Sequence, residues 1–129
     1  MPHSADNAGV RLAIAAECCY LANLTVMPLL GFFLLLAVYF ARFDTASVLA
    51  RCHLRQALVG SLWAGVLLIL LNALILLMGG YRSHFTVVTL ILYFFSVHSA
   101  LIILGMAGLA KAFAGQKFIY PLIGARCDD

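Results

Sequence analysis

Three long stretches of this 129-residue chain carry no Asp, Glu, Lys or Arg. They run over Cys18–Ala41, Gln56–Tyr81 and Ser83–Ala110, and each exceeds the roughly 20 residues that a helix needs to cross a hydrocarbon core about 30 Å thick. Charged residues make up 10% of the chain, against roughly 25% in ordinary soluble domains. The sequence therefore predicts a single all-α, polytopic membrane helical bundle and excludes a small soluble domain.

The second and third stretches predict two spans that form a tight hairpin. Span 54–78 is apolar throughout and stops at Gly79 and Gly80, a pair that favours a turn. Span 85–114 begins shortly afterwards and ends before Gly115. Because the connection is so short, we expect the two helices to lie antiparallel and side by side.

The N-terminal third leaves two arrangements open. Polar residues 1–10 precede an apolar segment, 12–42, that is long for one span and short for two. Pro28 interrupts this segment, because it lacks an amide donor and disfavours helix at Met27. The segment is therefore either a short interfacial helix followed by a third span or a Pro-broken re-entrant pair of half-helices.

Lys and Arg are distributed unequally along the chain. The basic loop 43–53 with its flanks and the C-terminal side with tail 115–129 hold six of them, whereas the turn between the two spans holds only Arg82. The six are Arg42, Arg51, Arg55, Lys111, Lys117 and Arg126. Loops rich in Lys and Arg stay in the cytoplasm, so we expect a cytoplasmic C-terminus. Arg11 joins that side if the first segment is re-entrant.

Small residues form one stripe along each predicted span, at helical spacing. Such residues allow membrane helices to approach closely. The predicted packing residues are Ala57, Ser61, Ala64 and Asn72 on span 54–78 and His98, Gly105, Gly108 and Ala112 on span 85–114. We expect the two stripes to hold the hairpin together, with Asn72 bonding across helices.

A second group of residues is expected to contact lipid or a partner protein. Arg51, His53 and Arg55 form a basic cluster at the mouth of the second span, where they either anchor the chain or bind an anionic head group. The apolar tail should lie at the membrane interface, since Pro121 biases Tyr120 towards an extended conformation. Such a tail suits docking against a neighbouring subunit or folding back over the bundle.

The sequence contains no recognisable catalytic motif, so we predict no enzyme activity. His98 lies about 20 Å from the depth of His53, too far for one haem to bind both. The four cysteines lack metal-site spacing and predict no disulfide framework. We therefore predict no cofactor and no metal. The net charge of +3 gives no support to a nucleic-acid partner.

Three stretches of the chain resemble a family of small bacterial membrane proteins. They are Cys19–Leu24 with Met27–Gly31, then His53–Leu58, and finally Lys111–Gly124 with its Tyr-Pro-Leu close. That family has no assigned function and is related to the chloroplast inner-envelope translocon component of the Tic complex. The resemblance covers residues 17–124 and implies a helical bundle of three or four segments in a bacterial inner membrane. The chain departs from the commoner pattern by lacking acidic residues just before His53.

Two functions are expected of such a chain. The first is a non-enzymatic accessory subunit that packs against a larger inner-membrane complex, with lipids, other integral membrane subunits or a second copy as partners. The second, which the resemblance implies, is a transport or permeation component. A pore needs a continuous polar stripe, and the polar side chains within the spans are few: Ser61, Asn72, Ser96, His98 and Ser99.

Overall fold

The computed structural model describes residues 2–127, with side chains from residue 6 onward. Within this range the chain forms helices and no β-strand, which confirms the all-α prediction for the described residues. In chain order the elements are α1 (Pro2–Thr25), α2 (Leu30–Arg42), α3 (Val48–Gly65), the π-helical η1 (Val66–Leu70), α4 (Leu71–Gly79) and α5 (His84–Phe113).

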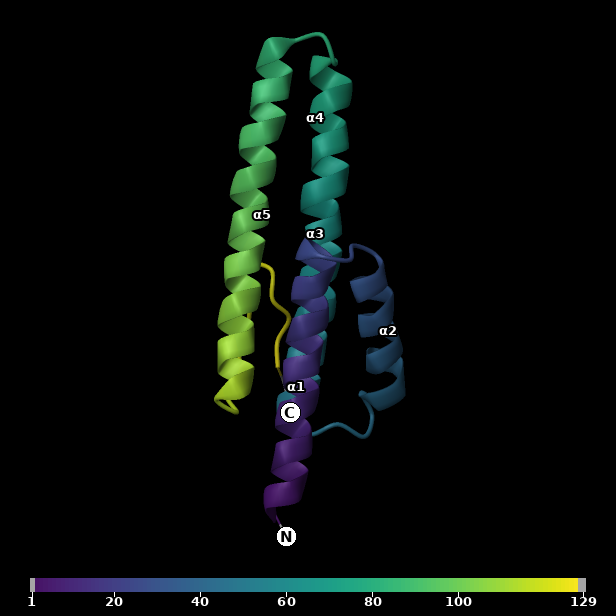
Figure 1. The fold of residues 1–129 in the computed structure, drawn as a ribbon, viewed down its shortest axis with the longest axis vertical. Coiled ribbons are helices and arrows are strands. Elements are labelled where there is room, and N and C mark those ends of the chain that lie inside the picture. Colours follow the sequence, from purple (N-terminus) through teal and green to yellow (C-terminus); the bar gives the residue numbers. More distant parts are fainter. Residues whose placement is uncertain (1, 128–129) are drawn as a thin grey trace.

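A long helical hairpin forms the axis of the molecule (Figure 1). α3, η1 and α4 continue one another from Val48 to Gly79, and α5 returns antiparallel to them. Gly80 ends α4 at a φ of 72°, and the Ser83 side chain caps α5 by accepting from the Thr86 amide at 3.4 Å. Both long helices are long and apolar enough to cross a membrane.

α1 and α2 form a shorter antiparallel pair along one half of the hairpin (Figure 1). The chain breaks around Pro28, as predicted, and the Asn23 side chain accepts from the Leu29 amide at 3.1 Å in the turn. A Cβ on Gly31 would lie 2.6 Å from the Asn23 amide nitrogen, so glycine permits this close approach. With 13 residues, α2 is too short to cross a bilayer alone, and among the described residues only Val48–Gly79 and His84–Phe113 are long and apolar enough to do so.

Two predicted boundaries differ from the structure, and the tail adopts one of its predicted arrangements. Residues 2–10 of the polar N-terminus belong to α1. The basic loop 43–53 is helical in its second half, because the Ser47 side chain caps α3 by accepting from the Ala50 amide at 3.3 Å. The described part of the tail, 115–127, folds back over the bundle, which is one of the two arrangements predicted for it. Gly115, at a φ of 67°, ends α5 and turns the tail back into the bundle (Figure 1).

The core lies in the half of the hairpin where α1, α3, α5 and the tail meet. Gly105, Gly108 and Ala112 of the α5 stripe are buried, and the two glycines face side chains of α1 and not those of α3, the predicted packing partner. A Cβ on Gly105 would lie 2.6 Å from the Tyr20 ring, and one on Gly108 would lie 2.7 Å from the Glu17 carboxylate. The physical reason is that α1 and the tail fill the space between the long helices.

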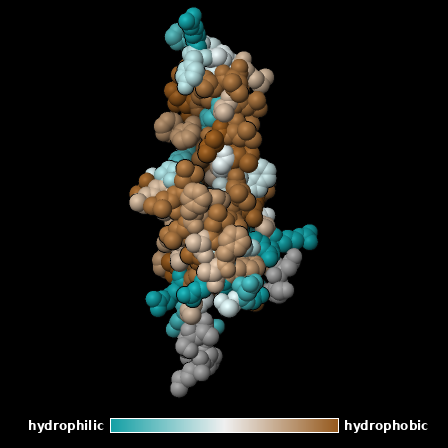
Figure 2. All heavy atoms as spheres, turned by 90° about the vertical axis from the view of Figure 1, so that its right-hand side faces the viewer, coloured by the Kyte–Doolittle hydropathy of each residue, from teal (hydrophilic) through white to brown (hydrophobic). Residues whose placement is uncertain are grey.

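The exposed surface is mainly apolar between two hydrophilic ends (Figure 2). Arg82 lies in the α4–α5 turn at one end. The start of α3 and the end of α5, with the basic residues beside them, lie at the other end (Figure 1). α4 and the first half of α5 extend beyond α1 and α2, so their apolar faces are covered by no other described segment.

Candidate functional site

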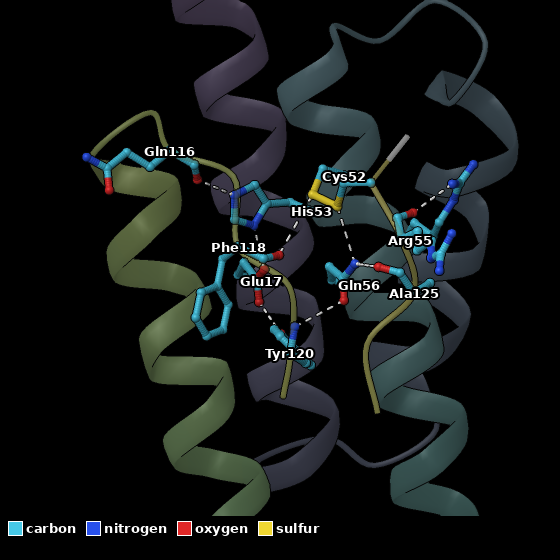
Figure 3. Close-up of a disulfide and its surroundings, with 11 residues drawn as sticks. Glu17, Cys52, His53, Arg55, Gln56, Gln116, Phe118, Tyr120 and Ala125 are labelled. Atoms are coloured by element: carbon cyan, nitrogen blue, oxygen red, sulfur yellow. Dashed lines mark hydrogen bonds and ion pairs between the residues drawn. A yellow bond between two sulfur atoms is a disulfide. The ribbon is translucent and has the colours of Figure 1, made fainter. Parts of the chain in front are cut away.

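A carboxylate and an imidazole lie together in the core, although the chain has few ionisable groups to bury. Glu17 of α1 and His53 of α3 both have no exposed surface. Their Oε1 and Nδ1 atoms are 2.6 Å apart, and His53 Nε2 lies 2.9 Å from the Gln116 carbonyl oxygen (Figure 3). Buried ionisable groups are costly unless they are paired and hydrogen-bonded, and this pair meets both conditions.

The partners of His53 fix where its protons lie. A carbonyl oxygen only accepts, so Nε2 carries a hydrogen that it donates to Gln116. The short Nδ1–Oε1 contact needs one further proton between imidazole and carboxylate. The pair therefore holds two protons in this arrangement. Loss of either proton would leave two acceptor atoms facing each other with no hydrogen between them.

Tyr120 of the tail supplies the other contact of the carboxylate. Its hydroxyl donates to Glu17 Oε2 in a short hydrogen bond, and 1% of the residue is exposed (Figure 3). Burial, together with the neighbouring carboxylate, raises the pKa of Tyr120, so the phenol stays protonated and able to donate. The ring lies over Gly60, where a Cβ would come within 2.8 Å of it. Both carboxylate oxygens of Glu17 are therefore satisfied.

The Gln56 side chain forms hydrogen bonds with both arms of the tail, that is, with the segments before and after its turn, as a backbone peptide unit would. Its Oε1 accepts from the Tyr120 amide at 3.2 Å, and its Nε2 donates to the Ala125 carbonyl (Figure 3). Between these points the tail turns, and the Gly124 amide donates to the Tyr120 carbonyl at 2.9 Å. A Cβ on Gly124 would lie 2.6 Å from Gln56 Oε1, so the turn depends on glycine here.

A disulfide between Cys52 and Cys127 fastens the end of the described tail to α3 (Figure 3). The sequence predicted no disulfide framework, and the spacing of the cysteines did not indicate this single bond. The reason is tertiary: the folded-back tail brings two residues 75 positions apart to a Cα–Cα distance of 5.0 Å. Cys18 and Cys19 are free. Among the described residues no three His, Cys, Asp or Glu side chains are grouped to hold a metal ion.

Two residues predicted to contact lipid or a partner are buried inside the chain instead. His53 points away from Arg51 and Arg55, because its two ring nitrogens are bound by Glu17 and the tail. Tyr120 is buried for the same reason.

The other residues of that predicted contact group remain at the surface. Arg51 donates to the carbonyls of Phe43 and Asp44, and Arg55 donates to the Arg126 carbonyl at 3.0 Å. Pro121 is exposed at the turn of the tail.

The predicted packing residues are only partly brought together. The predicted residues in the half of the hairpin that α1 and the tail cover are buried. They are Ala57, Ser61, Ala64, Gly105, Gly108 and Ala112. Asn72 does not bond across helices, because its amide donates to the Leu68 carbonyl of its own helix at 2.7 Å. His98 stacks on Phe94 at a centroid distance of 5.2 Å and is half-buried. Its Nδ1 is buried without a hydrogen-bond partner, as is the Ser61 hydroxyl.

Sequence reasoning missed Glu17, Gln56 and the disulfide as parts of one site. One signal was available for Glu17: it is the only acidic residue within the first apolar segment, and such a residue generally has a partner. The bond between His53 and the Gln116 carbonyl places the start of α3 beside the end of α5, as expected of a tight antiparallel hairpin. No local pattern marked Gln56 as the residue that holds the tail.

The cluster can hold and exchange protons, and it can bind an extended peptide segment through Gln56. Comparisons of the chain with known protein families, with curated proteins and with solved structures found no match. The resemblance to the Tic-related bacterial proteins therefore stays a prediction.

Proposed function

We propose that the chain is a non-enzymatic accessory subunit of a bacterial inner membrane, with a cytoplasmic C-terminus, that packs against the helices of a larger complex. The observation that carries the proposal is the half of the hairpin that no other described segment covers. There, α4 and α5 expose large apolar side chains such as Leu77, Phe85 and Leu92. Lipid and partner helices are the two surroundings that such a surface accepts.

An open apolar groove between α4 and α5 supports contact with a partner helix. Its volume is about 400 Å³, and Asn72 is the one polar side chain among its lining residues. The lining residues are Leu68, Asn72, Ala73, Leu76, Leu90, Ile91, Phe94 and Phe95. Shape complementarity is the main source of helix association in lipid, so a groove favours docking more than a smooth face does.

Filling the groove tests this function. We expect Ala73→Trp to release the chain from a complex that survives mild detergent, because the indole occupies the space of the partner. Ile69→Trp is the matched control, since Ile69 is 69% exposed and does not line the groove. Native mass spectrometry measures the outcome. A wild-type chain that carries only lipid, or an Ala73→Trp complex of unchanged mass, would contradict the proposal.

The buried Glu17–His53 pair favours a second candidate, a transport or permeation component. Ionisable residues at membrane depth commonly belong to proton or ion paths. Under this alternative, proteoliposomes with an internal pH dye would show a proton leak that Glu17→Gln abolishes. Equal dye traces for wild-type, Glu17→Gln and protein-free liposomes would exclude it.

A further inference from the structure

We propose that residues 114–127 are a plug over the Glu17–His53 pair and that the Cys52–Cys127 disulfide is a redox latch that keeps the plug seated. The inference rests on the orientation in the proposed function, with the disulfide end towards the cytoplasm. It concerns this chain alone and needs no partner.

The attachments of the tail are concentrated on a short stretch of α3. Cys52 holds Cys127 covalently, His53 holds the Gln116 carbonyl, and Gln56 holds both arms of the turn (Figure 3). All these α3 residues lie within about one and a half helical turns, so they act on the tail as one unit. The covalent bond keeps the non-covalent partners at high effective concentration.

The plug covers a polar site that nothing else described in the chain satisfies. The Gln116 carbonyl and the Tyr120 hydroxyl both come from the tail, and they complete the hydrogen bonds of His53 and Glu17. Departure of the tail removes both partners at once. The buried pair then requires water or another polar ligand in their place.

The position of the disulfide makes it reversible in a reducing compartment. It lies at the basic end of the molecule, beside exposed Arg51 and Arg126. By the distribution of Lys and Arg this end faces the cytoplasm, where thiols are normally kept reduced. Cys52 is 3% exposed, whereas Cys127 is half-buried and open to attack.

Opening of the latch is a two-electron exchange with a dithiol reductant. A thiolate of the reductant attacks the Cys127 sulfur, and Cys52 leaves as a thiolate that takes up a proton. The second reductant thiol then attacks the mixed disulfide, loses its proton and releases Cys127, which is protonated in turn. The reductant leaves as its disulfide, and the chain has gained two electrons and two protons.

Amide exchange within the tail tests the latch. The protein is reconstituted in phosphatidylcholine–phosphatidylglycerol vesicles with Cys18→Ser and Cys19→Ser, which leaves the disulfide pair as the only cysteines. The Tyr120 amide reports seating, because it donates to Gln56 of α3, and the Gly124 amide reports the turn of the seated tail, because it donates to the Tyr120 carbonyl. We expect dithiothreitol to raise their exchange by about a hundredfold, the lower end of the effect that an intramolecular link has on the binding of its neighbouring contacts. Reoxidation should restore the protection.

Cys127→Ser separates the disulfide from other effects of the reductant. We expect its tail to exchange at the fast rate with or without dithiothreitol, while the amides of α5 stay protected in every sample. Equal protection of Tyr120 in the oxidised parent and in Cys127→Ser would overturn the latch, because the tail would then stay seated without the disulfide. An impermeant phosphine that reduces the disulfide only from the outer face of intact cells would overturn the orientation, and with it the cytoplasmic latch, without affecting the groove test.

Discussion

At the scale of single residues, Glu17 and His53 are tolerated in an apolar core because every polar atom of the pair has a partner. Burial of two ionisable groups costs several kcal/mol each unless additional hydrogen bonds satisfy them. Here the tail supplies those bonds through Gln116 and Tyr120, and Gly108 allows α5 to close over the carboxylate. Stability at this site therefore depends on groups far apart in sequence.

Tyr120→Phe tests the contribution of the phenol. The ring packing is kept, but Glu17 Oε2 loses its donor, and an unsatisfied buried acceptor costs about 1–3 kcal/mol. We expect a lower midpoint of thermal unfolding in detergent. Tyr81→Phe is the matched control and should leave the midpoint unchanged, since Tyr81 is 80% exposed. Equal midpoints for both variants would show that the hydroxyl contributes nothing.

Gly108→Ala tests the close approach of α5 to the carboxylate. The new methyl would lie 2.7–2.8 Å from the Glu17 carboxylate atoms, so we expect a loss of about 1–3 kcal/mol of stability. Gly65→Ala should instead gain about 0.5–1 kcal/mol, because nothing lies within 4 Å of its Cβ position. Chemical denaturation of the two variants measures both changes. A stabilised Gly108→Ala would refute the packing of α1 on α5.

At the scale of elements, the tail has the role of an additional helix, although it has no regular secondary structure. It lies where α3 and α5 would otherwise face each other, and its exposed backbone groups are met by Gln56, His53 and its own turn. Irregular backbone in a protein core is tolerated only when its amide and carbonyl groups have hydrogen-bond partners. The tail is therefore part of the bundle and not an appendage.

Truncation after Gly115 tests the tail as a structural element. The structure predicts that such a truncation destabilises the bundle. The shortened chain loses the disulfide and the partners of Glu17 and His53, and loss of a native disulfide alone typically costs about 2–5 kcal/mol. We expect a lower unfolding midpoint in detergent. Leu122→Asn is the control, because Leu122 is fully exposed with a φ of 68° that Asn tolerates. A truncated chain as stable as the wild type would contradict this view.

At the scale of the whole molecule, Lys and Arg are distributed unequally between the two ends of the long axis. The start of α3 and the end of α5 lie at the basic end, and the turn with Arg82 lies at the other (Figure 1). Under the proposed cytoplasmic orientation of the basic end, the two antiparallel arms of the hairpin cross the membrane in opposite directions.

Cysteine labelling in intact cells checks the orientation. In a background with the four natural cysteines replaced by Ser, an impermeant maleimide should label Tyr81→Cys and not Thr45→Cys. Both positions are exposed, so access depends on the side of the membrane alone. After lysis both should react equally. Labelling of Thr45→Cys but not Tyr81→Cys before lysis would reverse the topology.

The sequence by itself determined the local features. The second and third charge-free stretches predicted the two apolar helices. Pro28 predicted the break between α1 and α2, and Gly80 predicted the turn of the hairpin. These features depend on hydrophobicity, on a missing amide donor and on backbone freedom, all of which belong to neighbouring residues.

Only the tertiary structure decided which helix faces are joined and where the tail lies. The stripe with Gly105 and Gly108 could pack on any helix with a complementary surface, and periodicity does not distinguish α1 from α3. The Glu17–His53 contact and the Cys52–Cys127 bond join residues 36 and 75 positions apart, respectively. Such pairs form because burial of a polar group requires a partner, and only the folded chain specifies which partner is within reach.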